Sequence, residues 1–178
     1  VYGTETAETR EDPRLKTRFD FDYYFGVVAH RFAAQAVAGY PLTIYGKGEQ
    51  RKPFVSLEDC VEGLTRLALD ETADVESHRV YNQVTRPIAI VEMAETIREV
   101  GEELGLTVDL THVENPRDED ETHKMEIEND RYLDLIGGQH QSFTDGVRDI
   151  MDTLIDNEAT VESHTDRFLP PVLTEESE

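Results

Sequence analysis

The sequence predicts a mixed α/β domain with a single core, and three observations support this fold class. Apolar residues recur at helical spacing in several segments, most clearly from Ile90 to Leu104. Short apolar runs bounded by Gly and Pro, such as Leu42–Tyr45, lie between these segments and predict strands. The chain has 178 residues, which is enough for one domain with a real core.

Turn and capping residues mark the boundaries of elements in the first half of the chain. Gly39 is a natural helix stop, and Gly46-Lys47-Gly48 predicts a turn. Ser56 and Asp59 have the spacing of a capping box, which opens a helix. We expect, in order, the end of a buried strand at Val1–Gly3, an exposed loop at Thr4–Thr17, a helix at Phe25–Gly39, strands at Leu42–Tyr45 and Phe54–Val55, and a helix with Val61, Leu64, Leu67 and Ala68 on its apolar face.

In the second half of the chain, two further segments have apolar residues at helical spacing, and residues that predict strands lie before and between these segments. Gly105 is placed to cap the first of these helices, and Ser142 or Thr144 starts the second. Beyond Asn157 the chain is polar, so we expect a frayed or docked tail. The expected elements are a strand at Val80–Val84, a helix at Ile90–Leu104, a strand at Thr107–Val113, an acidic loop at Arg117–Glu128, and helices at Asp130–Ile136 and up to Ile155.

The charge balance excludes two classes of partner. The 39 acidic residues outnumber the 17 Lys and Arg residues, and the formal net charge is −22. Such a surface repels a nucleic-acid backbone and an anionic membrane, so we expect neither as a partner. The apolar periodicity argues against disorder. The acidity instead indicates a halophilic adaptation, in which salt screens the self-repulsion of the surface.

This acidity leads to a prediction about salt. Removing salt lengthens the range over which surface carboxylates repel one another. The folded state holds these carboxylates closer together than the unfolded chain does, so the repulsion destabilises the folded state more. We expect the midpoint of thermal unfolding, followed by circular dichroism, to fall when the protein is moved from molar salt to a low-salt buffer. A melting curve that desalting leaves unchanged would contradict the halophilic interpretation.

Most motifs that carry chemistry are missing from the sequence. No G-x-G-x-x-G turn follows a strand, and no tyrosine has a lysine four positions later, so we expect no NAD-binding and no catalytic residues here. The six histidines and the single cysteine, Cys60, lack zinc-type spacing, which predicts no metal site and allows no intrachain disulfide. No apolar run approaches membrane-spanning length and no signal peptide is recognised, which favours a cytoplasmic protein.

One segment, residues 41–59, concentrates the candidate binding residues. It places two adjacent cations, Arg51 and Lys52, in a very acidic protein, and such a pair suits a phosphate or pyrophosphate. Tyr45 ends the preceding strand, where its ring can cover a base. On these residues alone, an ordinary salt-bridged turn is the simpler explanation.

This segment resembles the substrate-domain signature of the extended short-chain dehydrogenase/reductase family, also called the NAD-dependent epimerase/dehydratase family. There, a strand of roughly the form LxxYGxGxQxRxFxxxxD runs into a helix, and Leu42 to Asp59 is similar to it. Lys52 stands where the family usually has arginine. The resemblance implies substrate contacts by Thr43 and Tyr45 at the base, by Arg51 or Lys52 at the pyrophosphate, by Arg117 at the other side of the diphosphate, and by Arg18 near the sugar.

Further motifs in the same order resemble one branch of that family, the UDP-sulfoquinovose synthases. Arg18 to Gly26, His30 to Phe32 and Arg79 to Gln83 are similar to its motifs, with His30 at a position where asparagine is typical. The resemblance implies an α/β fold that is the C-terminal substrate-binding portion of the family's enzymes. Its parts would be a remnant strand of the Rossmann NAD domain and a substrate loop at 1–24, a sugar-nucleotide-binding domain at 25–157, and a polar tail at 158–178.

The resemblance also implies what the chain does and does not do. It would bind a UDP-sugar, with UDP-glucose expected, and would be inactive alone. NAD is the cofactor of the complete family enzyme, which converts UDP-glucose and sulfite to UDP-sulfoquinovose, and a separate N-terminal NAD-binding half is a candidate partner. The alternatives are a fragment of a UDP-sugar epimerase or dehydratase, and a non-catalytic module that binds a nucleotide sugar or another subunit.

Overall fold

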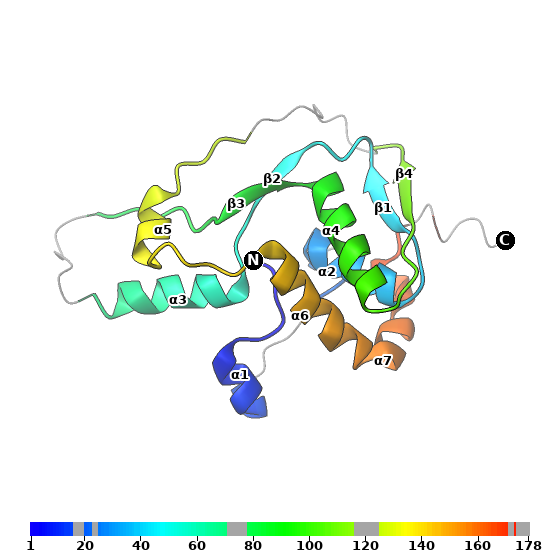
Figure 1. The fold of residues 1–178 in the computed structure, drawn as a ribbon, viewed down its shortest axis with the longest axis horizontal. Helices are drawn as coiled ribbons and strands as arrows, with labels where there is room; N and C mark the ends of the chain where they lie inside the picture. The colour runs from blue at the N-terminus through cyan, green and yellow to red at the C-terminus, as the bar shows by residue number, and fades with distance from the viewer. Residues whose placement is uncertain (16–19, 23–24, 71–77, 116–124, 171–172, 174–178) are drawn as a thin grey trace.

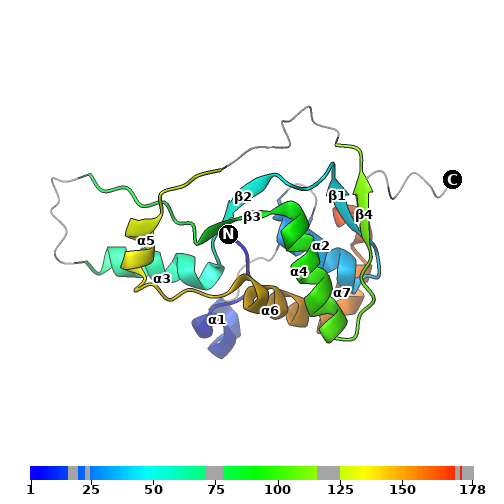
Figure 2. The ribbon, with the colours of Figure 1, turned by 45° about the horizontal axis from the view of Figure 1, so that its top comes forward.

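Two small sheets and a set of packed helices organise the chain in the computed structural model (Figure 1). Figures 1 and 2 show helices α3 and α5 at one end of an elongated molecule and α2, α4 and α6 towards the other, with the β2–β3 ribbon between them. The structure describes the whole chain except residues 16–19, 23–24, 71–77, 116–124, 171–172 and 174–178.

Each sheet has two strands. In the first, β1 (Leu42–Tyr45) pairs in parallel with β4 (Leu110–Val113), so that Leu42 faces Leu110. In the second, β2 (Arg51–Phe54) pairs antiparallel with β3 (Arg86–Ala89). The turn that joins β1 to β2 therefore connects the two sheets, which places it at the centre of the sequence segment that resembles the substrate-domain signature.

The main core lies between three helices and β1. These helices are α2 (Val28–Val37), α4 (Ile90–Glu103) and α6 (Phe143–Ile155), and they pack against one another. Their inward faces carry apolar residues at helical spacing, as the sequence predicts, and these are almost completely buried. Burial of this apolar surface is the main stabilising contribution to the fold. The largest apolar side chains of the three helices that are fully buried are Phe32, Met93, Ile97, Ile150 and Met151.

Helix α3 (Leu57–Ala68) begins where the sequence predicts. The Ser56 hydroxyl accepts a hydrogen bond from the Asp59 main-chain N–H at 3.0 Å, which satisfies one free donor of the first turn. One side of α3 packs against α5 (Asp130–Leu135), where the Tyr132 ring lies over Gly63. The Tyr132 hydroxyl donates a hydrogen bond to the Asp59 carbonyl at 2.7 Å. These contacts form a second, smaller core beside Val55.

The first residues of the chain form part of a parallel pair, in agreement with the predicted strand end. Tyr2 makes an isolated parallel bridge with Ser56. Its N–H donates to the Val55 carbonyl at 3.0 Å, and its carbonyl accepts from the Leu57 N–H at 2.7 Å. Tyr2 is only 1% exposed, and its ring packs edge-on against Phe143 of α6. This contact joins the start of the chain to the main core.

The predicted strand at Val80–Val84 is wrong. The described residues there form no strand, and Val80 is 58% exposed. Side-chain amides take the place of a partner strand, since Asn129 donates to the Val84 carbonyl at 2.6 Å and Asn82 donates to the Glu128 carbonyl at 2.9 Å. The strand begins later, at Arg86, where β2 supplies a partner.

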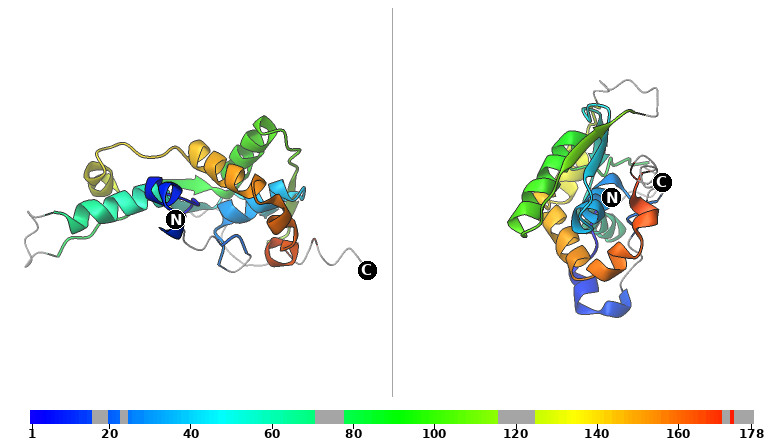
Figure 3. Two further views of the ribbon diagram at one scale, coloured as in Figure 1. Left: turned by 90° about the horizontal axis from the view of Figure 1, so that it is seen from below. Right: turned by 90° about the vertical axis from the view of Figure 1, so that its right-hand side faces the viewer.

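Three short helices lie where the sequence shows no apolar period. The predicted loop at Thr4–Thr17 contains α1 (Ala7–Glu11) and a 3-10 turn, η1 (Pro13–Leu15). After Asn157 the chain forms α7 (Glu158–Glu162) and α8 (Thr165–Phe168), which dock on α2. Figure 3 shows these two helices, coloured orange to red, against the body of the molecule. Docking is carried by two buried side chains, Val161 and Phe168.

No helix in the described part of the chain combines the length and the apolar character that crossing a bilayer requires.

Candidate functional site

The turn between β1 and β2 lies directly against the start of α4. Gly46 and Gly48 have φ values of +61° and +72°, which only glycine adopts readily. A Cβ atom at Gly48 would lie 2.7 Å from Ile44 Cγ2 and 3.1 Å from the Val91 nitrogen. Both glycines are therefore required, one for turn geometry and the other also for close approach to the helix.

Main-chain carbonyls of this segment cap α4, which has no side-chain cap. The Gly48 carbonyl accepts from the Val91 N–H at 2.9 Å, and the Gln50 carbonyl accepts from the Ile90 N–H at 3.3 Å. The His112 ring bonds the Gly46 carbonyl at 2.7 Å and so ties β4 to the turn. These bonds fix the turn relative to both sheets and to α4.

The two predicted cations of β2 have different surroundings. The Arg51 guanidinium donates to the Pro87 carbonyl at 3.1 Å and lies 3.6 Å from the Glu92 carboxylate, which also binds Arg86 at 2.7 Å. Lys52 is exposed, and no carboxylate among the described residues pairs with it. Consecutive strand residues point to opposite faces, so the two cations cannot both face one ligand from the strand. Lys52 is the cation that remains available.

The two predicted base-contacting residues lie on the other sheet. Thr43 and Tyr45 share one face of β1 because they are two residues apart. Thr43 is 3% exposed; its N–H donates to Gln35 Oε1 at 3.3 Å, and its hydroxyl accepts from Gln35 Nε2 at 3.5 Å. The polar groups of Thr43 are thus engaged inside the fold, whereas Tyr45 is half-buried at the strand end, beside the turn.

Gln50 is a polar residue of this segment to which sequence reasoning assigned no role. Its Oε1 atom is the buried side-chain oxygen, within the described residues, that has no hydrogen-bond partner. An unsatisfied buried acceptor costs about 1–3 kcal/mol unless a donor reaches it. Gln50 lies two residues after Gly48 and two residues before Lys52. The buried acceptor without a donor, Gln50 Oε1, and the cation without a carboxylate partner, Lys52, therefore belong to one short segment.

The other two predicted substrate contacts, Arg18 and Arg117, lie outside the described residues. The described chain leaves β4 at Val113, and because β1 and β4 are parallel, their carboxyl ends lie at the same edge of the sheet. Tyr45 and the turn are at this edge. The described residues that follow β4, Glu114 and Asn115, therefore leave the sheet on the side where the turn lies.

His30 joins the start of the chain to the segment at Asp20. It lies on α2 and is 7% exposed. Its Nε2 atom accepts a hydrogen bond from the Gly3 N–H at 3.0 Å, and its Nδ1 atom bonds the Asp20 carbonyl at 2.9 Å. These partners require a neutral ring with the proton on Nδ1. Burial lowers the pKa of His30 to about 4, against the opposing effect of its bond to Asp20.

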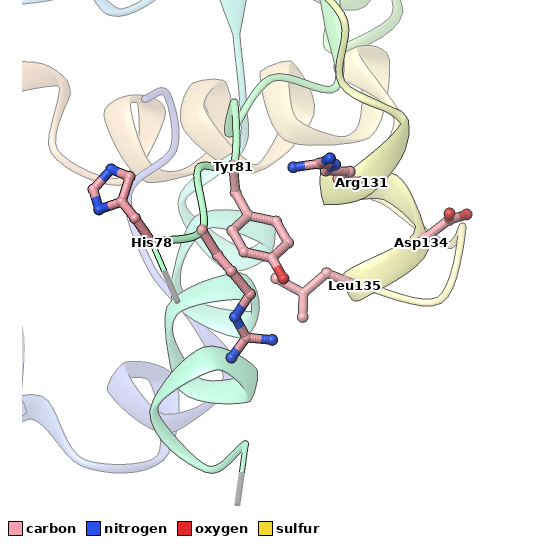
Figure 4. A pocket seen from close by; sticks show the side chains of 6 residues that line it. His78, Tyr81, Arg131, Asp134 and Leu135 are labelled. Carbon is pink, nitrogen blue, oxygen red and sulfur yellow. The ribbon is translucent and has the colours of Figure 1, made fainter. Parts of the chain in front are cut away.

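A separate hollow of about 740 Å³ lies at the outer ends of α3 and α5 (Figure 4). In this view the Arg131 side chain extends towards the Tyr81 ring, and the Asp134 carboxylate points away from it. Arg79 is held by Asp70 at 3.0 Å, whereas no carboxylate in the described part of the chain pairs with Arg131. Arg79 and Tyr81 belong to a stretch that resembles a family motif, but no pattern in the sequence predicts a hollow here. The lining residues are His78, Arg79, Tyr81, Arg131, Asp134 and Leu135.

Metal ligation finds no support in the described residues. No group of three or more His, Cys, Asp or Glu side chains in that part of the chain is arranged to hold a metal ion. Cys60 is half-buried, and its thiol lies 3.5 Å from Gln83 Oε1. The described turn carries an exposed lysine, Lys52, a buried acceptor without a partner, Gln50 Oε1, and a half-buried aromatic ring, Tyr45.

Two curated proteins with the same name are similar to this chain in sequence. The UDP-sulfoquinovose synthase of Sulfolobus acidocaldarius is 46% identical over 123 residues, which are 69% of this chain and 31% of that protein. The chloroplastic UDP-sulfoquinovose synthase of Spinacia oleracea is 38% identical over 135 residues, which are 76% of this chain and 28% of that protein. The chain thus spans less than a third of the length of either relative. No protein-family model matches it.

A solved structure shows the same fold. The UDP-glucuronic acid 4-epimerase of Bacillus cereus, crystallised with NAD and a fluorinated UDP-glucuronic acid, matches with a TM-score of 0.61 over 88% of this chain and 43% of the epimerase. At 19% identity this likeness concerns the fold alone. The sequence similarity to the two synthases identifies the chain as a relative of the UDP-sulfoquinovose synthases within the extended short-chain dehydrogenase/reductases.

Proposed function

We propose that this chain supplies the UDP-sugar-binding part of a nucleotide-sugar enzyme that resembles UDP-sulfoquinovose synthase, with UDP-glucose as its ligand. The observation that carries the proposal is the segment Gly46 to Lys52, in which a cation without a carboxylate partner and a buried acceptor without a donor lie two residues apart. A nucleotide sugar offers a pyrophosphate to the cation and hydroxyl or imide donors to the acceptor.

The roles of individual residues follow from this arrangement. Lys52 binds the pyrophosphate, because Arg51 is already bound to Glu92 and to the Pro87 carbonyl. Tyr45 covers the base from the end of β1, and Thr43 supports the strand from inside. Arg117 as a second phosphate contact and Arg18 as a contact near the sugar rest on the resemblance to the family.

The reaction itself is assigned to the complete enzyme. We assign no catalytic residue and no NAD contact to this chain, and NAD would be held by the part of the relatives that lies outside the matched region. The identity of 46% with a protein named UDP-sulfoquinovose synthase favours that reaction over epimerisation, since the epimerase structure is only 19% identical. UDP-glucose and sulfite are therefore the substrates we propose for the assembled enzyme.

Calorimetric titration with UDP-glucose tests this assignment. We expect Lys52→Gln to weaken binding about tenfold or more, because a charge-assisted bond to a phosphate contributes roughly 1.5–3 kcal/mol. Arg51→Gln should have a smaller effect, since its guanidinium is engaged with Glu92. Lys47→Gln, an exposed lysine of the same turn, is the matched control.

Two outcomes would count against the proposal. If Arg51→Gln abolished binding and Lys52→Gln did not, the pyrophosphate contact would be assigned to the wrong cation. If the folded wild-type chain did not bind UDP-glucose at all, the proposed function of the isolated chain would be rejected.

A further inference from the structure

Residues 20–22, which we call the 20–22 segment, are held by two different helices. The Asp20 carbonyl bonds the Nδ1 atom of His30 on α2 at 2.9 Å. The Phe21 ring packs edge-on against the ring of Phe168 on α8, with 5.7 Å between the ring centroids and 64° between the ring planes. The segment is therefore fixed by a hydrogen bond on one side and by an aromatic pair on the other.

The aromatic contact comes from the other end of the sequence. Helices α7 and α8 dock on α2 (Figure 3), and their buried side chains include Val161, which is 1% exposed, and Phe168, which is 0% exposed. Helix α8 has four residues, which is too short for a helix to persist without tertiary contacts. The pair of Phe21 and Phe168 therefore orders the 20–22 segment and α8 together.

The 20–22 segment lies at the carboxyl end of a parallel pair. Tyr2 and Ser56 form the parallel bridge, and Gly3 follows Tyr2. The Gly3 N–H donates to His30 Nε2 at 3.0 Å, so the same imidazole ring joins Gly3 to the 20–22 segment. In α/β proteins, ligands bind outside the carboxyl ends of parallel strands. The segment therefore borders a place that is suited to a ligand.

The position of this place relative to Lys52 suits the sugar of the ligand. Strand β2 runs from the turn towards Ser56, which lies four residues after Lys52, or about 13 Å at the usual rise of a strand. Tyr45, to which we assign the base, precedes Lys52 in the chain. A nucleotide sugar with its pyrophosphate at Lys52 can therefore extend its sugar towards the 20–22 segment. The two aspartates of this segment carry acceptors for sugar hydroxyls.

We propose that Phe168 is a positioning residue, which holds the 20–22 segment at the sugar end of the site through its contact with Phe21. The proposal rests on the proposed function, because it concerns the same ligand. Phe168 acts through the Phe21 ring and is given no contact with the ligand. An ordered segment loses less conformational freedom when the sugar binds. The aromatic pair therefore strengthens the binding of UDP-glucose and leaves the binding of UDP unchanged.

Calorimetric titration of the full chain with UDP and with UDP-glucose tests this role. We expect Phe168→Leu and Phe21→Leu each to lower the affinity for UDP-glucose relative to UDP about threefold or more, since either change removes the aromatic pair. The double variant should lose no more than either single variant, because both remove the same contact. Val161→Ala is the matched control, which leaves a gap beneath the same C-terminal helices but keeps both rings. Thermal melting checks that each variant is folded.

Amide chemical shifts of the wild-type chain give an independent check, because the shifts that UDP-glucose causes and UDP does not should include those of the 20–22 segment. The proposal is overturned if neither leucine variant changes the relative affinity, if Val161→Ala lowers it equally, or if the segment shows no sugar-dependent shift. When UDP and UDP-glucose bind, any of these results rejects the role of Phe168 and leaves the proposed function standing. When neither ligand binds the folded chain, both are rejected.

Discussion

Replacing Gly146 with alanine is expected to destabilise the fold by about 2–3 kcal/mol, which is large for the addition of one methyl group. A Cβ atom at Gly146 would lie 2.5 Å from Tyr2 Cε2 and 3.1 Å from Gln141 Oε1. The Tyr2 ring cannot move aside, because it is 1% exposed and packs against Phe143 and Phe54. Denaturant unfolding measures the change in the free energy of unfolding.

The sign of the change in the free energy of unfolding distinguishes the packing clash from the effect of helix propensity. Gly146 lies inside α6, where glycine to alanine would otherwise stabilise the helix by up to about 1 kcal/mol. Asp152→Ala, at an exposed position of the same helix, should change stability by no more than about 0.5 kcal/mol. A Gly146→Ala variant as stable as the wild type would show that Tyr2 is not packed against α6 as described here.

Acidification from about pH 6.5 to pH 4 is expected to remove about 3 kcal/mol of stability through His30 alone. In the unfolded chain a histidine takes up its proton near pH 6.5, whereas burial holds the pKa of His30 at about 4 in the folded protein. The unfolded state therefore binds more protons across this window, so stability falls as the pH falls and the loss is complete below pH 4. Protonation would also place a donor opposite the Gly3 N–H.

His30→Gln isolates this contribution from that of the many carboxylates. Glutamine does not titrate, and its side-chain oxygen can reach the position of Nε2 to accept from Gly3. The free energy of unfolding is measured against pH for both proteins. We expect the difference between them to change by about 3 kcal/mol between pH 6.5 and pH 4. A difference that is constant with pH would mean that His30 titrates alike in the folded and unfolded chains.

Helices whose apolar residues recur regularly at helical spacing were predictable from the sequence. Helix α4 was expected at Ile90–Leu104 and is observed at Ile90–Glu103, and Ser142, one of the two expected starts of α6, is its cap. In both cases the apolar spacing and the boundary residues point to the same structure. The Ser56 cap of α3 was likewise visible in the sequence.

Elements that depend on distant partners were not predictable. The strand expected at Val80–Val84 has suitable side chains, but the partner of this region, β2, pairs only with Arg86–Ala89. Helices α7 and α8 are held by a few tertiary contacts, such as those of Phe168, which local sequence does not reveal. Strand pairing and helix docking depend on contacts between residues that are far apart in the sequence, and local propensity does not determine them.

The candidate site was predictable as a segment but not as a set of contacts. The sequence placed Arg51 and Lys52 together, and only the structure separates them, because Glu92 on α4 engages one of the two. The unsatisfied Gln50 acceptor and the hollow beside Arg131 depend on burial and on distant elements meeting. No pattern in the local sequence distinguishes these residues from ordinary surface ones.

The most direct test of the proposed UDP-sugar site is a titration of the isotopically labelled chain with UDP-glucose, followed by amide chemical shifts in nuclear magnetic resonance. We expect the largest shifts on the β1–β2 turn, from Tyr45 to Lys52, and we expect them to saturate with one ligand per chain. Shifts that fall instead on the hollow lined by Tyr81 and Arg131, or a spectrum that UDP-glucose leaves unchanged, would contradict it.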